Sequence, residues 1–353
     1  MADVEDDDVE DFVDENRTLA VDIKYKITSF GADFLVDGLV DRFKNGDIYV
    51  PDFQRSFVWT KPQASRFLES ILLGLPIPGI FLFREEDTNK MLVVDGLQRL
   101  SSLTAFLTGK FPDTDKTFRL ENVSERFEGK AFADLEPEDK RQINNTIIHA
   151  TIFQQSLPSD DDSSVYLIFE RLNTGGTPLQ PQEIRAALYH GPFSDFLSEL
   201  NEIESWRKIF GRTSRRRKDE ELILRFLAFL YSKENYQSPM VRFLNRFMSA
   251  NRHLTKLKKK QVSEQFEKTF NFIYESLGSS AFRPSRSLNA AVLDAVATTV
   301  AKHQLYDELT PKQFATKYNK LLRKKGFQEA ISTSTADESV VDQRFTEAEK
   351  TIV

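Results

Sequence analysis

The spacing of apolar residues changes near residue 193, and this change constrains the fold more than any other feature of the chain. Before it, residues 21–110 alternate strand-like stretches, such as "GIFLF" and "MLVVD", with segments whose apolar residues recur every three or four positions. The polar turn between those two stretches predicts a hairpin. After residue 193, long amphipathic helices predominate, for example "DEELILRFLAFLYSK". The sequence therefore predicts an α+β fold, in which a small mixed sheet with helices is followed by an α-helical bundle domain.

The charge distribution sets the N-terminal segment apart from the rest. Residues 1–15 carry nine acidic and no basic side chains, so without them the net charge of −6 becomes +3. We therefore predict a disordered acidic tail over residues 1–20, a first domain over 21–192 and an α-helical domain over 193–353. An alternative role for the tail is to mimic nucleic acid and cover a basic face of the protein.

Composition limits both the chemistry and the compartment. The 353 residues include no cysteine, which excludes disulfides and thiolate zinc sites, and the four histidines are scattered without metal-ligand spacing. No apolar run approaches the roughly 18 residues that a membrane span needs, and the acidic N-terminus is unlike a signal peptide. These features predict a soluble intracellular protein that is cytoplasmic, with a nuclear location left open, and that does not contact a membrane.

The segment 93–103, "VVDGLQRLSSL", has the pattern of a strand that turns at a glycine into a helix. Free N–H groups at a helix start bind anions, and Gly96 would let a ligand approach the backbone closely. Arg99 would bind a phosphate, and Gln98 would donate further hydrogen bonds. Asp95 would hold Mg²⁺ or orient a water molecule. The alternative is structural: Asp95 caps the helix and Arg99 pairs with a surface acid.

Two further segments raise the same choice between a ligand site and a structural role. In "VPDFQRSFVW", Gln54 and Arg55 lie between phenylalanines in a stretch that Pro51 keeps out of a helix. The arginine there contacts either a buried acid or a ligand. In "FERLNTGGTPLQPQEIR", the two glycines form either a helix terminus or a backbone lining for a site that Arg171, Asn173 and Glu183 would face.

Basic residues gather in three blocks after residue 210, "GRTSRRRK", "KLKKK" and "LLRKKG". The first contains Arg215, Arg216, Arg217 and Lys218. Such blocks are either solvated surface or a track for nucleic-acid phosphates. Aromatic residues are not interleaved with them, which argues against stacking on single-stranded bases. The chain contains no P-loop, dinucleotide-binding fingerprint or nucleophile elbow.

Three segments taken together resemble a known family. "VPDFQRSFVW", "ESILLGLPIPGIFL" with "VVDGLQRLSSL", and "FERLNTGGTPLQPQEIRAALYHG" resemble the N-terminal domain of GmrSD-type restriction enzymes, a ParB/sulfiredoxin-like domain marked by a DGQQR signature. The resemblance covers roughly residues 25–190. It implies a module that binds and hydrolyses a nucleoside triphosphate, either GTP or another NTP, with Mg²⁺. In such systems the module serves as a switch in defence against foreign or modified DNA.

The resemblance also implies roles for individual residues. It assigns catalysis to Asp95, Gln98 and Arg99, the metal to Asp95, and nucleotide binding to Gln54, Arg55, Gly96, Asn173 and Glu183. The signature's first glutamine is Leu97 in this chain. Its loss would weaken hydrolysis if that position meets the nucleotide, and would change nothing if the position faces the core.

The HNH nuclease half of GmrSD-type enzymes has no counterpart in these residues. This implies a standalone regulator, one subunit of a split system with a separate nuclease, or a descendant with another task. Two other functions compete with an NTPase (a hydrolase). A ParB-like DNA-binding module would bind DNA through Arg215–Lys218 and use nucleotide only as a gate. Direct nuclease action would need a metal-binding carboxylate cluster, and none is legible in the sequence. The oligomeric state stays open.

Overall fold

The computed structural model describes residues 9–10, 26–50, 57–85, 88–112, 114, 116–157, 163–172, 180–214 and 216–353. Contacts between Cα atoms divide the chain into two compact units. The sheet unit comprises Tyr25–Ser159 and Ser164–Pro178, and the helical unit comprises Met1–Lys24, Asp160–Ser163 and Leu179–Val353. The predicted domain limits at residues 20 and 192 stay predictions.

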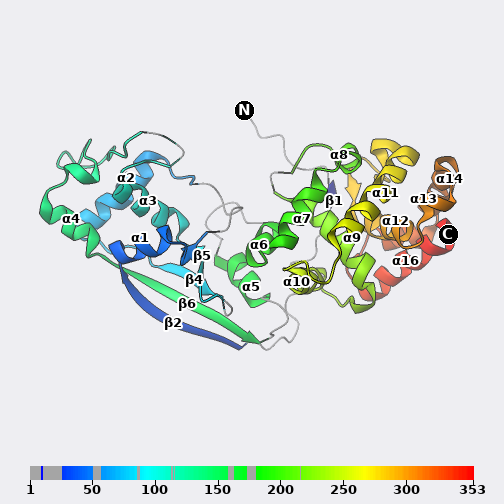
Figure 1. Ribbon diagram of the computed structural model, residues 1–353, viewed down its shortest axis with the longest axis horizontal. Coiled ribbons are helices and arrows are strands. Elements are labelled where there is room, and N and C mark those ends of the chain that lie inside the picture. Colours follow the sequence, from blue (N-terminus) through cyan, green and yellow to red (C-terminus); the bar gives the residue numbers. More distant parts are fainter. Residues whose placement is uncertain are drawn as a thin grey trace. The chain divides into compact units, whose positions relative to one another are not determined.

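A five-stranded mixed sheet organises the sheet unit (Figure 1). Its strands, in spatial order, are β2 (Lys26–Leu35), β6 (Ile147–Leu157), β4 (Ile80–Arg84), β5 (Met91–Asp95) and β3 (Ile48–Tyr49). Strands β4 and β5 form the antiparallel hairpin expected from the sequence, whereas β4 runs parallel to β6 and β3 runs parallel to β5. Strand β2 lies at the edge and pairs antiparallel with β6 over its whole length.

Four helices pack on one face of this sheet, namely α1 (Val36–Lys44), α2 (Lys61–Leu72), α3 (Leu97–Thr108) and α4 (Pro137–Asn144). A fifth helix, α5, spans Ser163–Leu172. The shared core combines helix residues such as Leu39, Leu68 and Phe106 with the strand residues Ile80 and Val93. Burial of these apolar side chains removes them from water and fixes the helices to the sheet. Helix α3 is therefore anchored along its length, which positions its N-terminal end.

The helical unit consists mainly of α-helices. These are α6 (Pro181–Leu188), α7 (Pro192–Asn201), α8 (Glu204–Phe210), α9 (Lys218–Ser232), α10 (Met240–Asn251), α11 (Lys259–Leu277), α12 (Ala290–Lys302), α13 (Leu305–Glu308), α14 (Pro311–Leu322), α15 (Lys325–Ala330) and α16 (Glu338–Ile352). Together with the mixed sheet, this architecture confirms the predicted α+β fold class.

A short two-stranded sheet completes the helical unit. Strand β1 (Val9–Glu10) pairs in parallel with β7 (Leu288–Asn289), so that Val9 lies opposite Leu288. Val9 and Glu10 fall within the segment, residues 1–20, predicted to be a disordered acidic tail. At Val9–Glu10 the structure differs from that expectation, because the backbone is paired with a strand of the helical unit.

Buried charges connect the helices at the centre of this unit. Oδ2 of Asp294 on α12 accepts hydrogen bonds from Nη2 of Arg225 on α9 at 2.7 Å and from Nη2 of Arg344 on α16 at 3.2 Å. All three side chains are almost completely buried. A buried charge is tolerated when it is paired and hydrogen-bonded, so this cluster ties three helices together. Among the described helices, none combines the length and the apolar character that a bilayer span requires.

Candidate functional site

Strand β5 passes into helix α3 through one left-handed residue, Gly96, whose φ is +101°. A Cβ atom at this position would lie 2.4 Å from Cγ2 of Ile80 on β4, so a larger residue cannot fit without movement of the core. Gly96 is itself the N-cap of α3, and no side chain caps the helix. The structural alternative in which Asp95 caps the helix is therefore wrong.

The guanidinium of Arg99 turns back over the start of its own helix. Nη2 donates hydrogen bonds to Oδ2 of Asp95 at 2.7 Å and to the carbonyl oxygen of Gly79 at 2.9 Å. Nε of Arg99 is buried and has no hydrogen-bond partner among the described residues. The Asp95 side chain is 42% exposed, whereas that of Arg99 is 18% exposed. This arrangement leaves part of the guanidinium and part of the carboxylate available to a ligand.

Gln98 connects helix α3 to the segment that precedes α2. Its Oε1 accepts hydrogen bonds from the backbone N–H groups of Val58 at 3.0 Å and Trp59 at 3.1 Å. Both residues belong to the motif "VPDFQRSFVW", so Gln98 joins the two motifs through their described parts. In this geometry the glutamine positions a neighbouring segment through its carbonyl oxygen.

The first turn of α3 has the features of an anion site. The first intrahelical bond runs from the N–H of Leu100 to the carbonyl oxygen of Gly96 at 2.9 Å, so the N–H groups of residues 97–99 precede the hydrogen-bonded ladder. Leu97, which replaces the signature's first glutamine, is half-buried and packs against the core of the sheet unit. That position contributes to packing in this chain, which is the second of the two alternatives drawn from the sequence.

Several predicted site residues lie outside the described residues. These are Gln54, Arg55 and Asn173 of the predicted nucleotide site, and Arg215 of the predicted DNA site. The structure therefore neither brings them to the start of α3 nor separates them from it, and their roles stay predictions.

Glu183 belongs to the helical unit, where its carboxylate has local partners. It occupies the third position of α6, and its Oε2 accepts a hydrogen bond from the N–H of Gln180 at 2.5 Å. The same oxygen accepts from Nε and Nη2 of Arg216 at 3.2 and 3.1 Å. These contacts make Glu183 a capping residue and an ion-pair partner, while its predicted contact with nucleotide stays untested.

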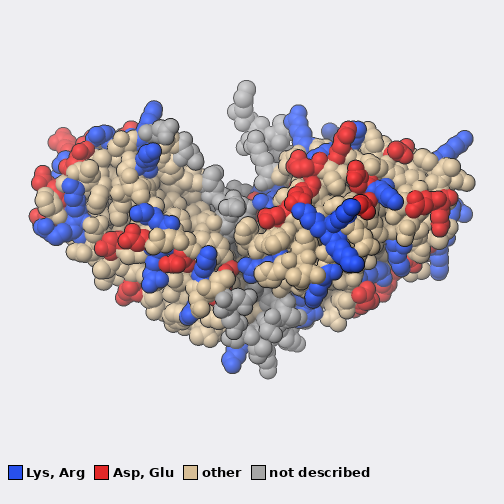
Figure 2. Space-filling model, in the orientation of Figure 1, with Lys and Arg blue, Asp and Glu red and all other residues tan. Residues whose placement is uncertain are grey.

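The described part of the predicted DNA site also has acidic partners. Arg216 pairs with Glu183, and Arg217 pairs with Glu220 at 2.7 Å within the first turn of α9. Lys218 is the first residue of that helix. On the face seen in Figure 2, basic side chains lie beside acidic ones over the helical unit. Paired cations attract a phosphate less strongly than unpaired ones, so the DNA role of Arg216, Arg217 and Lys218 stays a prediction that these contacts do not strengthen.

A histidine that sequence reasoning did not single out lies next to Gly79, whose carbonyl oxygen accepts a hydrogen bond from Arg99. Nδ1 of His149 on β6 is 2.8 Å from Oδ1 of Asp33 on β2. Gly79 packs closely against the backbone of His149. A Cβ atom on residue 79 would lie 2.5 Å from the carbonyl oxygen of His149. No sequence signal indicates this pair, because the register of β2 against β6 joins residues 116 positions apart.

Comparison with known proteins identifies the domain that contains this site. Residues 36–190 match the model of the family "GmrSD restriction endonuclease, N-terminal domain". This stretch is a GmrSD N-terminal domain. Asp95, Gly96, Gln98 and Arg99 all fall inside it, and the family's description is that of a restriction endonuclease.

One relative of this chain is an uncharacterized protein of Methanocaldococcus jannaschii. It is 30% identical over 134 residues, which cover 31% of this chain and 21% of that protein. The chain thus spans about a fifth of the length of the relative it matches.

Proposed function

We propose that the GmrSD N-terminal domain binds a nucleoside triphosphate, GTP or another NTP, at the start of α3 and hydrolyses it. The observation that carries the proposal is the Arg99 guanidinium, which is held by Asp95 and Gly79 through Nη2 while its buried Nε has no acceptor among the described residues. A buried donor without a partner carries a free-energy cost that a ligand oxygen would remove. The uncapped N–H groups of the first turn add a partial positive charge at the same place.

The residues present also suit Mg²⁺, which the family resemblance implies. Mg²⁺ is commonly held by one or two carboxylates together with water and substrate phosphates. Asp95 supplies one half-exposed carboxylate at this site. In the part of the chain that the structure describes, no group of three or more His, Cys, Asp or Glu side chains is arranged to hold a metal. Asp95 would therefore hold the ion jointly with the phosphates, and bound Mg²⁺ would neutralise part of their charge.

The proposed reaction needs positioning and charge stabilisation more than covalent chemistry. Water attacks the γ-phosphorus, the bond to the β–γ bridging oxygen breaks, and NDP and phosphate leave. Arg99 would stabilise the charge on the γ-phosphate oxygens, and the α3 N–H groups would bind a neighbouring phosphate. Gln98 would keep the segment at Val58 and Trp59 against the helix start. In a restriction system, the NTP-bound and NDP-bound states would then act as a switch for a DNA-directed activity. That activity would belong either to this chain or to a separate nuclease.

The first experiment is a thermal-shift screen of the full chain with the four NTPs and Mg²⁺, because a ligand that binds only the folded state raises the melting temperature. We expect at least one NTP to do so, and we expect phosphate release that Asp95→Ala or Arg99→Ala abolishes. Asp134→Ala is the matched control, since Asp134 pairs with Arg119 at 2.7 Å elsewhere in the same unit. Turnover that survives in both site variants would overturn the assignment.

A further inference from the structure

Strand β2 forms one outer edge of the five-stranded sheet (Figure 1). It is ten residues long, and β6 pairs with it along one side. None of the described strands pairs with its other side. An edge strand of this length presents a row of main-chain N–H and C=O groups, to which a further strand can bind.

The pairing with β6 determines which residues of β2 present those groups. The N–H of Val36 donates to the carbonyl oxygen of Thr146 at 3.0 Å, and the preceding Leu35 lies opposite Ile147. In an antiparallel ladder, residues that bond to the partner strand alternate with residues whose N–H and C=O groups point away from it. The register is continuous from residue 27 to residue 35. The residues with outward main-chain groups are therefore Ile27, Ser29, Gly31, Asp33 and Leu35.

This edge has few of the features that protect exposed strands from pairing. Sheet proteins commonly place charged residues, proline or bulges there. Strand β2 has no proline, and its charged residues are Lys26 and Asp33. Oδ1 of Asp33 lies 2.8 Å from Nδ1 of His149 on β6, so this carboxylate contacts the inner neighbour instead of the outer side. The register irregularity lies at the beginning of the strand, between Lys26 and Ile27.

The strand also exposes large apolar side chains. Ile27, Phe30 and Leu35 are 39%, 41% and 46% exposed, and Ile147, opposite Leu35, is 58% exposed. Covering such side chains removes apolar surface from water and is favourable. A strand that bound to this edge would thus gain both main-chain hydrogen bonds and apolar contacts.

The outer side of β2 is complementary to a second copy of itself. In an antiparallel pair related by a two-fold axis at Gly31, Ile27 of each copy would lie opposite Leu35 of the other. The outward main-chain groups would then face one another and exchange about ten hydrogen bonds. Apolar side chains that lie directly opposite each other stabilise a pair of strands.

Charge favours both this register and this direction. Moving the axis by one residue either way would place an aspartate, Asp33 or Asp37, opposite Ile27. Lys26 begins β2, Asp37 lies two residues beyond its end, and both are exposed. Antiparallel pairing brings Lys26 of one copy near Asp37 of the other at both ends, whereas parallel pairing would place like charges side by side.

We propose that two copies of this chain associate through β2, antiparallel and with the two-fold axis at Gly31. The five-stranded sheet of one copy would then continue into that of the other. The proposal concerns the outer edge of the sheet unit, and it does not rest on nucleotide binding at the start of α3.

The first test is sedimentation velocity of the full chain over a wide range of concentrations, where we expect a monomer–dimer equilibrium. Ser29→Pro removes an outward N–H and leaves the bonds to β6 in place, so it should weaken the dimer at least about tenfold. Ser29→Ala keeps that N–H and is the matched control. Ile27→Lys should also weaken the dimer, because it places a charge opposite Leu35. Its control is Leu73→Lys, at a leucine that is 55% exposed outside the sheet.

The second test determines the register, and the absence of cysteine from the chain makes it direct. Ile27→Cys mixed with Leu35→Cys should give a covalent dimer with a short thiol-reactive crosslinker. Ile27→Cys alone should not, because its two copies would lie eight residues apart along the pair, about 27 Å. Equal crosslinking of the mixture and of Ile27→Cys alone would contradict the axis at Gly31.

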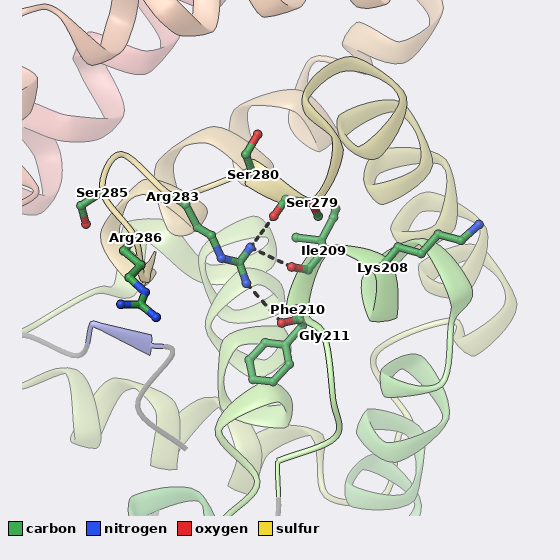
Figure 3. A pocket seen from close by; sticks show the side chains of 9 residues that line it. All are labelled: Lys208, Ile209, Phe210, Gly211, Ser279, Ser280, Arg283, Ser285 and Arg286. Atoms are coloured by element: carbon green, nitrogen blue, oxygen red, sulfur yellow. Dashed lines mark hydrogen bonds between the residues drawn. The ribbon is translucent and has the colours of Figure 1, made fainter. Parts of the chain in front are cut away.

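The pocket of the helical unit provides a control at a different surface. It is lined by Lys208, Phe210 and Arg286, among others (Figure 3). Arg286→Glu changes an exposed residue there and should leave the dimer unchanged. A dimer that Arg286→Glu dissociates and Ser29→Pro does not would place the interface on the helical unit and overturn the proposal.

Two further results would also overturn it. One is a chain that stays monomeric at every concentration, and the other is a dimer that both Ser29→Pro and Ile27→Lys leave intact. Far-UV circular dichroism checks that each variant is folded. If Ser29→Pro is unfolded, Ile27→Lys measured against Leu73→Lys decides.

Discussion

Asp95 and Arg99 form an ion pair of 2.7 Å across the first turn of α3, and the same guanidinium nitrogen also donates a hydrogen bond to the carbonyl oxygen of Gly79, the residue before strand β4. The pair therefore joins the end of β5, the start of α3 and the entry to β4. The two charged groups of the DGLQR motif are fixed relative to each other before any ligand arrives. Such preorganisation is what a site that stabilises charge requires.

Arg99→Lys should lower kcat for NTP hydrolysis at least tenfold, because a single ammonium cannot reproduce the planar fork of donors. Measured phosphate release under saturating NTP gives the comparison. Arg119→Lys is the control, since Arg119 also pairs with an aspartate in the same unit. A lysine variant with the turnover of the parent protein would show that the shape of the guanidinium is not needed.

Gly96→Ala should destabilise the sheet unit by about 2–4 kcal/mol, because a left-handed conformation and an overpacked Cβ add their costs. Gly109→Ala offers a matched comparison, since Gly109 also has a positive φ of +84° but a Cβ there meets no atom within 4 Å. That variant should lose only about 1 kcal/mol. Urea denaturation of both variants measures the difference, and equal losses would contradict the steric argument.

Gln98→Ala should release the segment at Val58 and Trp59, since two backbone N–H groups lose their acceptor. We expect their amide hydrogens to exchange about tenfold faster, as for the loss of roughly 1–1.5 kcal/mol of local stability. Hydrogen-exchange mass spectrometry of peptides covering residues 57–60 measures this directly. Gln98→Glu retains an acceptor oxygen and should preserve the protection; if it does not, the contact is not what holds the segment.

Tyr318 on α14 provides a prediction about pH. Burial raises the pKa of its hydroxyl to about 12. The folded state thus favours the protonated phenol. This contribution to stability is complete below the ordinary pKa near 10 and is lost as the pH rises toward 12.

Tyr318→Phe removes that ionisation. The parent protein should lose about 1 kcal/mol more than the variant between pH 8 and pH 11, while the two have similar stability at pH 8. Urea denaturation followed by far-UV circular dichroism at both pH values gives the comparison. Other tyrosines and lysines titrate equally in both proteins, so parallel losses would mean that Tyr318 ionises as easily in the folded state as in the unfolded one.

The sequence by itself determined the local elements of this protein. Apolar spacing predicted the β4–β5 hairpin, the helices of both units and the α+β class, because each depends on residues within a few positions of one another. The motif "VVDGLQRLSSL" predicted the turn at Gly96 for the same reason, and the family resemblance located the domain.

Only the tertiary structure decided which distant groups meet. Gln98 binds backbone 39 and 40 residues away, His149 meets Asp33 across two strands, and Glu183 pairs with Arg216 instead of lying free. None of these partners follows from local spacing, because strand register and helix packing are set by the burial of the whole apolar surface.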